Sequence, residues 1–170
     1  MPVACAATVP RPLRSTPSGA RIGIDLVHVD RIAASMQSFG ERFTHRLFAA
    51  GELRDSTVAG CLDPQRLALR FAAKEAVIKA FDLSEAGVRW SQIEMTDCVG
   101  EAGRIRLHGR AAESAARFGT YEIAVSSSLA SGLACAIVVA LPREDVLETN
   151  LRGDAGHEPA DAADKNTFEE

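Results

Sequence analysis

Two strand-like segments lie on either side of a Ser131-Gly132 turn in the second half of the chain. Residues 121–128 (YEIAVSSS) and 133–141 (LACAIVVAL) are rich in apolar and β-branched side chains, and the short connection between them is typical of a β-hairpin. Residues 89–99 and 104–109 form a second such pair around a turn that contains glycine. Because hairpins join antiparallel neighbours, the sequence predicts a mainly antiparallel sheet.

One long helix is marked by its start. Asp63 can cap it and Pro64 suits its first turn, and the helical pattern continues to about Asp82. Upstream, residues 21–29 (RIGIDLVHV) are expected to form a strand, since they are apolar and β-branched.

Shorter helices are expected elsewhere. Asp30 can cap a helix that buries Ile32, Met36 and Phe39, and further helices are expected at residues 51–58 and 110–119. The predicted order is a strand, three helices, two strands, a helix and two strands. Hairpins with segregated helices define an α+β fold, with helices packed on a mainly antiparallel sheet.

Charge is unevenly distributed along the 170 residues. Residues 1–20 carry two arginines and no acid, residues 142–170 carry nine acidic and three basic residues, and the part between balances fourteen against fourteen. We expect a flexible leader over 1–20, one domain over 21–142 and an acidic disordered tail over 143–170. A neutral body with an acidic tail is not the pattern of a nucleic-acid-binding protein.

The sequence carries no sign of secretion or of a membrane span. The apolar run LACAIVVAL is too short to cross a bilayer, and the first residues lack a basic start ahead of an unbroken apolar run. The four cysteines are scattered, without the spacing of zinc ligands or of a paired motif. A cytoplasmic protein with no membrane partner is expected.

An acid and a lysine share one line of the predicted long helix. Glu75 and Lys79 are four residues apart, beside Ala68, Ala72 and Ala76, which leave room for a ligand or another backbone. A solvated ion pair on an exposed face explains the spacing equally simply. A carboxylate can also hold a hard cation, and a lysine one turn later can meet a phosphate.

Asp25 is a charge inside an apolar predicted strand. Burying a charge is costly unless it is paired. Asp25 is therefore expected to cap a strand end, to form a salt bridge, for example with Arg21, or to supply a second carboxylate for the same cation. Mg²⁺ is commonly held by one or two carboxylates together with substrate phosphates.

Three segments, in this order, resemble the holo-acyl-carrier-protein synthases, the small trimeric group of 4′-phosphopantetheinyl transferases. They are GIDLVHVDRI (23–32), RFAAKEAVIKAF (70–81) and GVRWSQIEM (87–95), and the resemblance spans about residues 21–141. It implies the 4′-phosphopantetheinyl transferase fold and a homotrimer with sites at subunit interfaces. It also implies Mg²⁺-dependent transfer of the phosphopantetheine arm of coenzyme A to a serine of an apo acyl carrier protein, releasing adenosine 3′,5′-bisphosphate.

The same resemblance implies roles for individual residues. Asp25 and Glu75 correspond to the Mg²⁺ ligands, and Lys79 corresponds to the residue that contacts the diphosphate. These three residues are the expected catalytic residues. Arg70 corresponds to a coenzyme A contact. Lys74 matches another lysine of the family, although a solvated role is an equal alternative.

Contacts to the acyl carrier protein are implied for three arginines. Arg31 matches an arginine that faces the acidic recognition helix of the carrier, and Arg46 and Arg54 either extend this basic patch or are independent surface charges. The sequence does not distinguish a carrier of fatty acid biosynthesis from one of polyketide biosynthesis.

The match breaks near the end of the domain. Family members carry a histidine and an acid where this chain has Leu129 and Ala130, and none of its four histidines clearly replaces them. The neighbouring Ser127 and Ser128 either donate hydrogen bonds to the cofactor or are solvated. Two hypotheses follow. The first is an active transferase with an altered acid–base element. The second is a protein of the same fold with changed or lost chemistry that still binds a carrier protein or a coenzyme A derivative, either acting on a tethered substrate or serving only as a binding partner.

Overall fold

The computed structural model describes residues 19–96 and 103–143. The expected acidic tail, almost all of the expected leader and most of the turn between the first hairpin strands therefore lie outside the described residues. The helices and strands begin at Arg21 and end at Pro142.

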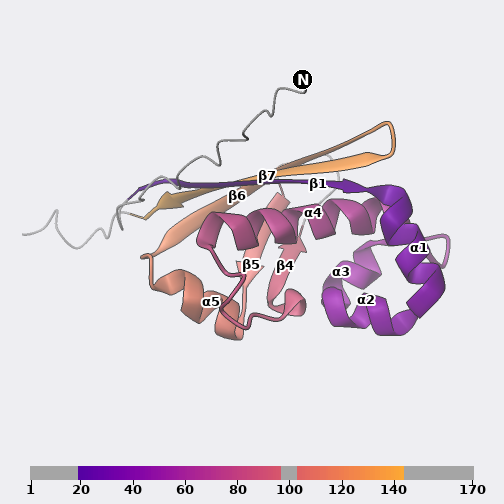
Figure 1. The fold of residues 1–170 in the computed structure, drawn as a ribbon, viewed down its shortest axis with the longest axis horizontal. Coiled ribbons are helices and arrows are strands. Elements are labelled where there is room, and N and C mark those ends of the chain that lie inside the picture. The colour runs from indigo at the N-terminus through magenta and orange to yellow at the C-terminus, as the bar shows by residue number, and fades with distance from the viewer. Residues whose placement is uncertain (1–18, 97–102, 144–170) are drawn as a thin grey trace, which may run out of the picture.

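A five-stranded antiparallel sheet forms one layer, and helices pack against one of its faces (Figure 1). The strands follow the spatial order β1 (Arg21–His28), β7 (Leu133–Pro142), β6 (Tyr121–Ala130), β5 (Gly103–Leu107) and β4 (Ile93–Thr96). Both expected hairpins are confirmed: β6 pairs with β7, and β4 pairs with β5. The α+β prediction is confirmed as well.

The long helix α4 (Pro64–Phe81) lies across the sheet and carries much of the core. Its start is as predicted, since the Asp63 side chain accepts a hydrogen bond from the Gln65 backbone N–H at 2.9 Å. The helix approaches β1 so closely that a Cβ atom on Gly23 would lie 1.9 Å from the Ala76 carbonyl oxygen. Glycine in the strand and alanine in the helix thus allow two backbones to meet, which was one of the predicted uses of the alanines.

Three short helices form one end of the molecule (Figure 1). They are α1 (Val29–Phe39), α2 (Glu41–Leu47) and α3 (Ala50–Asp55). Helix α2 was not predicted, nor was the small hairpin of β2 (Thr57–Val58) and β3 (Cys61–Leu62), which replaces the expected end of the helix at 51–58.

The prediction for Phe39 is wrong, because this side chain is 65% exposed. It shares a face of α1 with Ile32, which is buried, and Met36, which is partly buried. Burial falls along the helix because its last turn extends beyond the core.

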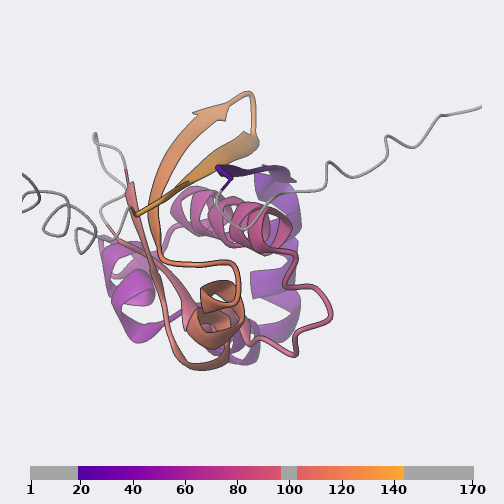
Figure 2. The same ribbon diagram turned by 90° about the vertical axis from the view of Figure 1, so that its left-hand side faces the viewer.

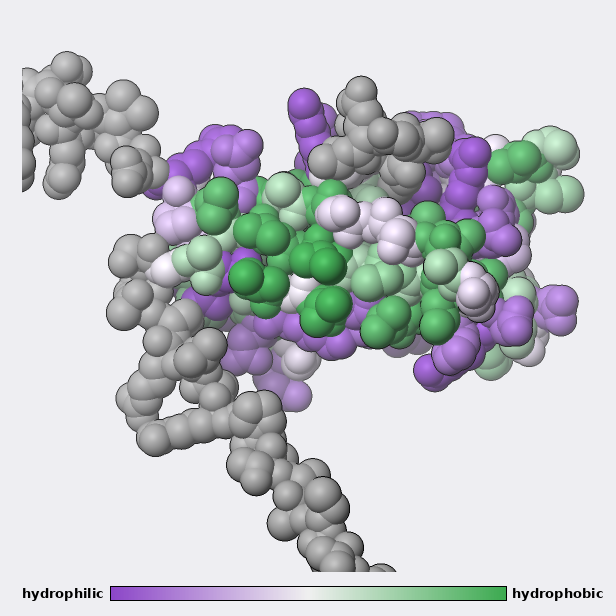
Figure 3. Space-filling model, turned by 90° about the horizontal axis from the view of Figure 1, so that it is seen from above, coloured by the Kyte–Doolittle hydropathy of each residue, from purple (hydrophilic) through white to green (hydrophobic). Residues whose placement is uncertain are grey.

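The long strands have two different faces. One faces α4 and includes Asp25, whose row across the sheet continues through Ala136 to Ser127. The other is an apolar surface that the described residues leave uncovered, and it appears as the green area in Figure 3. Its exposed side chains are Ile22, Ile24, Leu26, Ile137 and Leu141.

The last helix, α5 (Gly109–Ala116), connects β5 to β6 beneath the sheet (Figure 2). A short 3-10 turn, Trp90–Gln92, precedes β4 and shortens that strand at its start relative to the prediction. Within the described residues, no helix has both the length and the apolar character needed to span a bilayer.

Candidate active site

Asp25 and Lys79 meet at the contact between β1 and α4. Lys79 Nζ lies 2.6 Å from Asp25 Oδ1 and also donates a hydrogen bond to the Ile24 carbonyl oxygen at 3.1 Å. The Asp25 side chain is 14% exposed, whereas the Lys79 side chain is 52% exposed. The expected pairing of Asp25 with Arg21 is wrong, because the Arg21 guanidinium lies 3.6 Å from the Phe118 ring centre and donates to the Ala80 carbonyl oxygen.

Glu75 shares a cavity of about 290 Å³ with Asp25. Strand β1 and helices α1, α2 and α4 each contribute to its wall. Its lining residues are Asp25, Leu26, Val27, Arg31, Ile32, Ser35, Phe43, Phe71 and Glu75. The sequence predicted the charged members of this set, but Phe43 was missed because α2 was missed, and Ser35 carried no motif of its own.

The environment of Glu75 favours its protonated form. Burial raises the pKa of the Glu75 carboxyl above its ordinary value of 4.5, the negative charge of Asp25 raises the pKa further, and Lys79 acts in the opposite direction. Two carboxylates that repel one another in a half-buried cavity favour the binding of a cation.

The donor set fits a hard divalent ion, although the described residues contain no cluster of three or more acidic, histidine or cysteine side chains. Two carboxylates are enough when substrate phosphates and water complete the coordination of Mg²⁺. The exposed Lys79 ammonium adds a positive charge beside the cavity, where a phosphate can approach. Asp25, Glu75 and Lys79 are thus brought together as predicted, but Asp25 and Lys79 bind each other directly.

The two serines of β6 that were predicted to contact the cofactor, Ser127 and Ser128, point in opposite directions. Ser127 is in register with Ala136 and Asp25, so it faces the side of the sheet on which the site lies. Ser128 is in register with Cys135 on the apolar outer face, and the structure does not bring it to Asp25. Leu129 lies one row beyond Ser127, in line with Ala134 and Val27, and it faces the same side as Asp25.

The three predicted carrier contacts are exposed arginines on three successive helices. Arg31 of α1 lines the same cavity as Asp25 and Glu75. Arg46 of α2 and Arg54 of α3 are exposed and do not line it.

Arg70 lies on another side of α4 and does not line the cavity. The side chain is 2% exposed, its Nη2 atom lies 3.8 Å from Asp55 Oδ2, and its Nε and Nη1 atoms have no hydrogen-bond partner among the described residues. A buried guanidinium with two unpartnered nitrogens can donate hydrogen bonds to an anionic ligand. Its role as a coenzyme A contact stays a prediction.

Lys74 is fully buried, so the solvated alternative is wrong. Its Nζ atom donates to Glu52 Oε2 at 2.7 Å and to the carbonyl oxygens of Trp90 and Ile93. Burial lowers the pKa of Lys74, while Glu52 opposes the shift. Glu52 was missed by sequence reasoning: it also accepts hydrogen bonds from the backbone N–H groups of Ala49 and Met95, and so ties α3 and β4 to α4.

The structure is a small α+β domain in which two carboxylates share one cavity and a lysine contacts one of them. A family model of the 4′-phosphopantetheinyl transferase superfamily matches residues 21–138, and the chain belongs to this superfamily.

Named relatives and solved structures agree with this superfamily assignment. The holo-[acyl-carrier-protein] synthases of Solibacter usitatus and Desulforudis audaxviator are 36% and 38% identical to this chain, over 69% and 71% of it and 94% and 91% of their own lengths. A Chronobacterium ammoniagenes ACPS–CoA complex matches with a TM-score of 0.63 at 26% identity, over 74% of this chain and 99% of that one. The Helicobacter pylori synthase in complex with coenzyme A matches with a TM-score of 0.60 at 27% identity, over 70% and 98%.

Proposed function

We propose that this protein is a holo-acyl-carrier-protein synthase. It transfers the 4′-phosphopantetheine arm of coenzyme A to a serine of an apo acyl carrier protein and releases adenosine 3′,5′-bisphosphate. The observation that carries this proposal is the convergence of Asp25 and Glu75, from two elements far apart in the sequence, at one cavity, with Lys79 bound to Asp25. Relatives that share most of the domain carry the same activity in their names.

The reaction needs positioning and charge neutralisation more than it needs a nucleophile from the enzyme. The carrier serine oxygen forms a bond to the phosphorus that bears the pantetheine arm, the bond from that phosphorus to the leaving phosphate oxygen breaks with its electron pair on that oxygen, and the serine proton passes to water. Asp25 and Glu75 would hold Mg²⁺, which offsets the negative charge of the diphosphate. Lys79 would exchange its contact with Asp25 for a diphosphate oxygen.

Leu129 favours a second candidate function. Its side chain lies on the same side of the sheet as Asp25, at the position where family members have histidine, and a leucine can neither accept a proton nor donate a hydrogen bond. The second candidate is a protein of this fold that binds coenzyme A or a carrier protein without transferring the arm. Retention of both carboxylates and of Lys79 supports the active enzyme instead, because binding alone does not require a metal pair.

Arg31, at the mouth of the cavity, together with Arg46 and Arg54 would receive the acidic carrier. Arg70 and Ser127 would contact coenzyme A, and Ser128 would do so from the outer face of the sheet. The carrier serves fatty acid or polyketide biosynthesis, the location is the cytoplasm, and neither nucleic acid nor membrane is a partner.

A homotrimer would explain the apolar outer face of the sheet. Monomeric soluble proteins rarely expose a contiguous apolar patch of this kind, and three copies could cover it. Sites at subunit interfaces would then place Ser128 of one copy near a neighbour. Ile24→Glu should dissociate the trimer in sedimentation equilibrium, while Glu85→Gln, at an exposed position outside the sheet, should leave it intact.

The decisive assay is the mass of an apo carrier protein after incubation with coenzyme A, Mg²⁺ and the enzyme. We expect the carrier mass to increase by one phosphopantetheine arm with the wild type and with Glu85→Gln. The rate with Glu75→Gln should be lower by roughly a hundredfold or more, because a charge-neutralising ligand is lost. If several carriers all remain unmodified, the second candidate function holds.

A further inference from the structure

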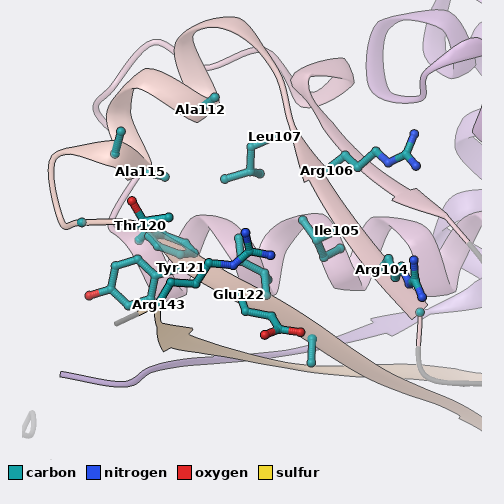
Figure 4. Close-up of a pocket in the computed structure, with 16 residues that line it drawn as sticks. Arg104, Ile105, Arg106, Leu107, Ala112, Ala115, Thr120, Tyr121, Glu122 and Arg143 are labelled. Atoms are coloured by element: carbon teal, nitrogen blue, oxygen red, sulfur yellow. The ribbon is translucent and has the colours of Figure 1, made fainter. Parts of the chain in front are cut away.

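The sheet contains a gap between two neighbouring strands, β5 and β6. Among the residues that the structure describes, ladder pairing between these strands covers only Gly103 with Val125 and Arg104 with Ala124. Beyond this point the strands separate and enclose a groove of about 810 Å³ that α5 also lines (Figure 4). Phe81 of α4 is a further lining residue. None of Asp25, Glu75 and Lys79 lines this groove.

One edge of the groove is an open strand edge. The backbone N–H of His108 donates to the Gln92 carbonyl oxygen on the β4 side. Because neighbouring residues of an antiparallel strand alternate in direction, the N–H groups of Ile105 and Leu107 point the other way, into the groove. Open edges of this kind accept an added strand.

The lining combines an apolar floor with a basic rim. Ile105, Leu107 and Ile123 supply apolar side chains. Arg104, Arg106 and Arg143 are exposed at the rim (Figure 4), and none of the three forms an ion pair with another described residue. Among the described residues that line the groove, Glu122 is the single acidic one, against three arginines, so the rim has an excess of positive charge.

The chain that continues beyond Arg143 has the opposite charge. Arg143 lies at the rim and donates its backbone N–H to the Thr120 carbonyl oxygen at 2.8 Å, so the described part of the chain ends beside the groove. Residues 144–151 read EDVLETNL, which places three acids next to Val146, Leu147 and Leu151. Residues 144–170 as a whole contain nine acids and two basic residues.

We propose that the acidic segment beginning at Glu144 occupies this groove in its own chain and adds a strand to the open edge of β5. Strand β7 runs toward Arg143, so a chain that turns back there enters the groove antiparallel to β5. At about 3.3 Å per residue, 144–151 can span about 26 Å, ample for the three residues of β5 that lie past its pairing with β6. Glu144 and Glu148, which share one face of such a strand, would face the arginine rim.

The covalent link favours this occupant over a separate acidic protein. A segment attached at the rim has an effective concentration in the millimolar range, which a free partner does not reach. The proposal does not depend on the catalytic assignment, since it involves a different cavity and none of the residues assigned to catalysis.

The test measures amide hydrogen exchange of Ile105 and Leu107 in the full chain at low ionic strength. Three variants are compared with the wild type: Arg104→Glu/Arg106→Glu, the tail variant Glu144→Lys/Asp145→Lys/Glu148→Lys, and the combination of both sets. Each single set should accelerate exchange at Ile105 and Leu107 by roughly tenfold or more, and the combination should restore slow exchange because the charges are complementary again. Arg117→Glu, an exposed arginine that does not line the groove, is the matched control and should have no effect.

Unchanged slow exchange in the α4 core would show in each variant that the fold is intact. Fast exchange at Ile105 and Leu107 in the wild type, or no restoration in the combined variant, would overturn the proposal. If protection from exchange grows with protein concentration, the groove is occupied by a second copy of the chain. If protection appears only after addition of coenzyme A or an apo carrier protein, that ligand occupies the groove. Either result also overturns the proposal that the chain's own acidic segment is the occupant.

Discussion

Lys79 Nζ lies 2.6 Å from Asp25 Oδ1, although the two residues are 54 positions apart in the sequence. This contact exists because α4 and β1 touch backbone to backbone at Gly23 and Ala76. Glu75 lies one turn before Lys79 on α4, so the same close approach places it in one cavity with Asp25. The position of the candidate active site therefore depends on the packing of a single helix against a single strand.

Gly23→Ala should disturb this packing. The added Cβ would lie 1.9 Å from the Ala76 carbonyl oxygen, and because this atom belongs to a helix backbone, the helix and strand must move apart. We expect the free energy of unfolding to fall by about 1–3 kcal/mol and transfer activity to fall with it. The check is urea denaturation. Gly51→Ala is a suitable control, because its Cβ would meet only the far ends of two side chains, those of Glu94 and Arg54, and no backbone atom of another described segment. Equal losses for both variants would contradict this explanation.

The stability of the metal-free protein should depend on the ionisation of Glu75. Its pKa is raised in the folded state, so its favourable contribution is fully present below pH 4.5 and is lost as the pH rises through the folded-state pKa. Glu75→Gln should therefore be more stable than the wild type at pH 8 without metal, and the difference should vanish toward pH 4.5. Thermal unfolding across this range in a chelating buffer is the measurement. A wild type that is more stable than the variant at pH 8 would contradict the sign.

The Glu52–Lys74 ion pair should be essential for the stability of the fold, and the loss of one partner alone should be costly. Both side chains are fully buried, and together they bond to the backbone of α3, β4 and the turn before β4. Lys74→Met leaves a buried carboxylate without its partner, and we expect a loss of about 3–5 kcal/mol in the free energy of unfolding. Combining Lys74→Met with Glu52→Gln should recover part of this loss in denaturant titrations. A double variant that is less stable than either single variant would rule out the pair as the cause.

Arg31→Glu should separate carrier recognition from coenzyme A binding. Arg31 is exposed at the cavity and would face an acidic partner, so charge reversal should raise the KM for the carrier by roughly three- to tenfold. The KM for coenzyme A should stay within a factor of about two. Arg89→Glu, an exposed arginine that does not line this cavity, provides the control in the same steady-state assay. Equal effects on both substrates would contradict the assignment of Arg31 to the carrier.

Much of the fold was predictable because its signals are local. The Asp63-Pro64 start of α4, the hairpin around Ser131-Gly132 and the apolar β1 each follow from a few adjacent residues. Short elements such as α2 and the β2–β3 hairpin have little periodicity, and they were missed. The exposure of Phe39 could not be predicted, because its position on α1 does not reveal where the core ends.

The candidate site was predictable in its residues but not in its contacts. The motif and the resemblance identified Asp25, Glu75 and Lys79, yet the partner of Asp25 depends on how α4 crosses β1, which no local pattern records. Lys74 illustrates the same limit. Its neighbours in the sequence are compatible with an exposed lysine, and its burial depends on Glu52 arriving from a different helix.

The central claim is that Asp25 and Glu75 jointly hold a divalent ion against the diphosphate of coenzyme A. Calorimetric titration of Mg²⁺ into the protein saturated with coenzyme A tests it most directly, with Asp25→Asn and Glu75→Gln beside the wild type and Glu85→Gln as the control. We expect one ion per site in the wild type and the control, and binding weakened by at least about tenfold in each of the other two variants. Undiminished Mg²⁺ binding in both Asp25→Asn and Glu75→Gln would contradict it.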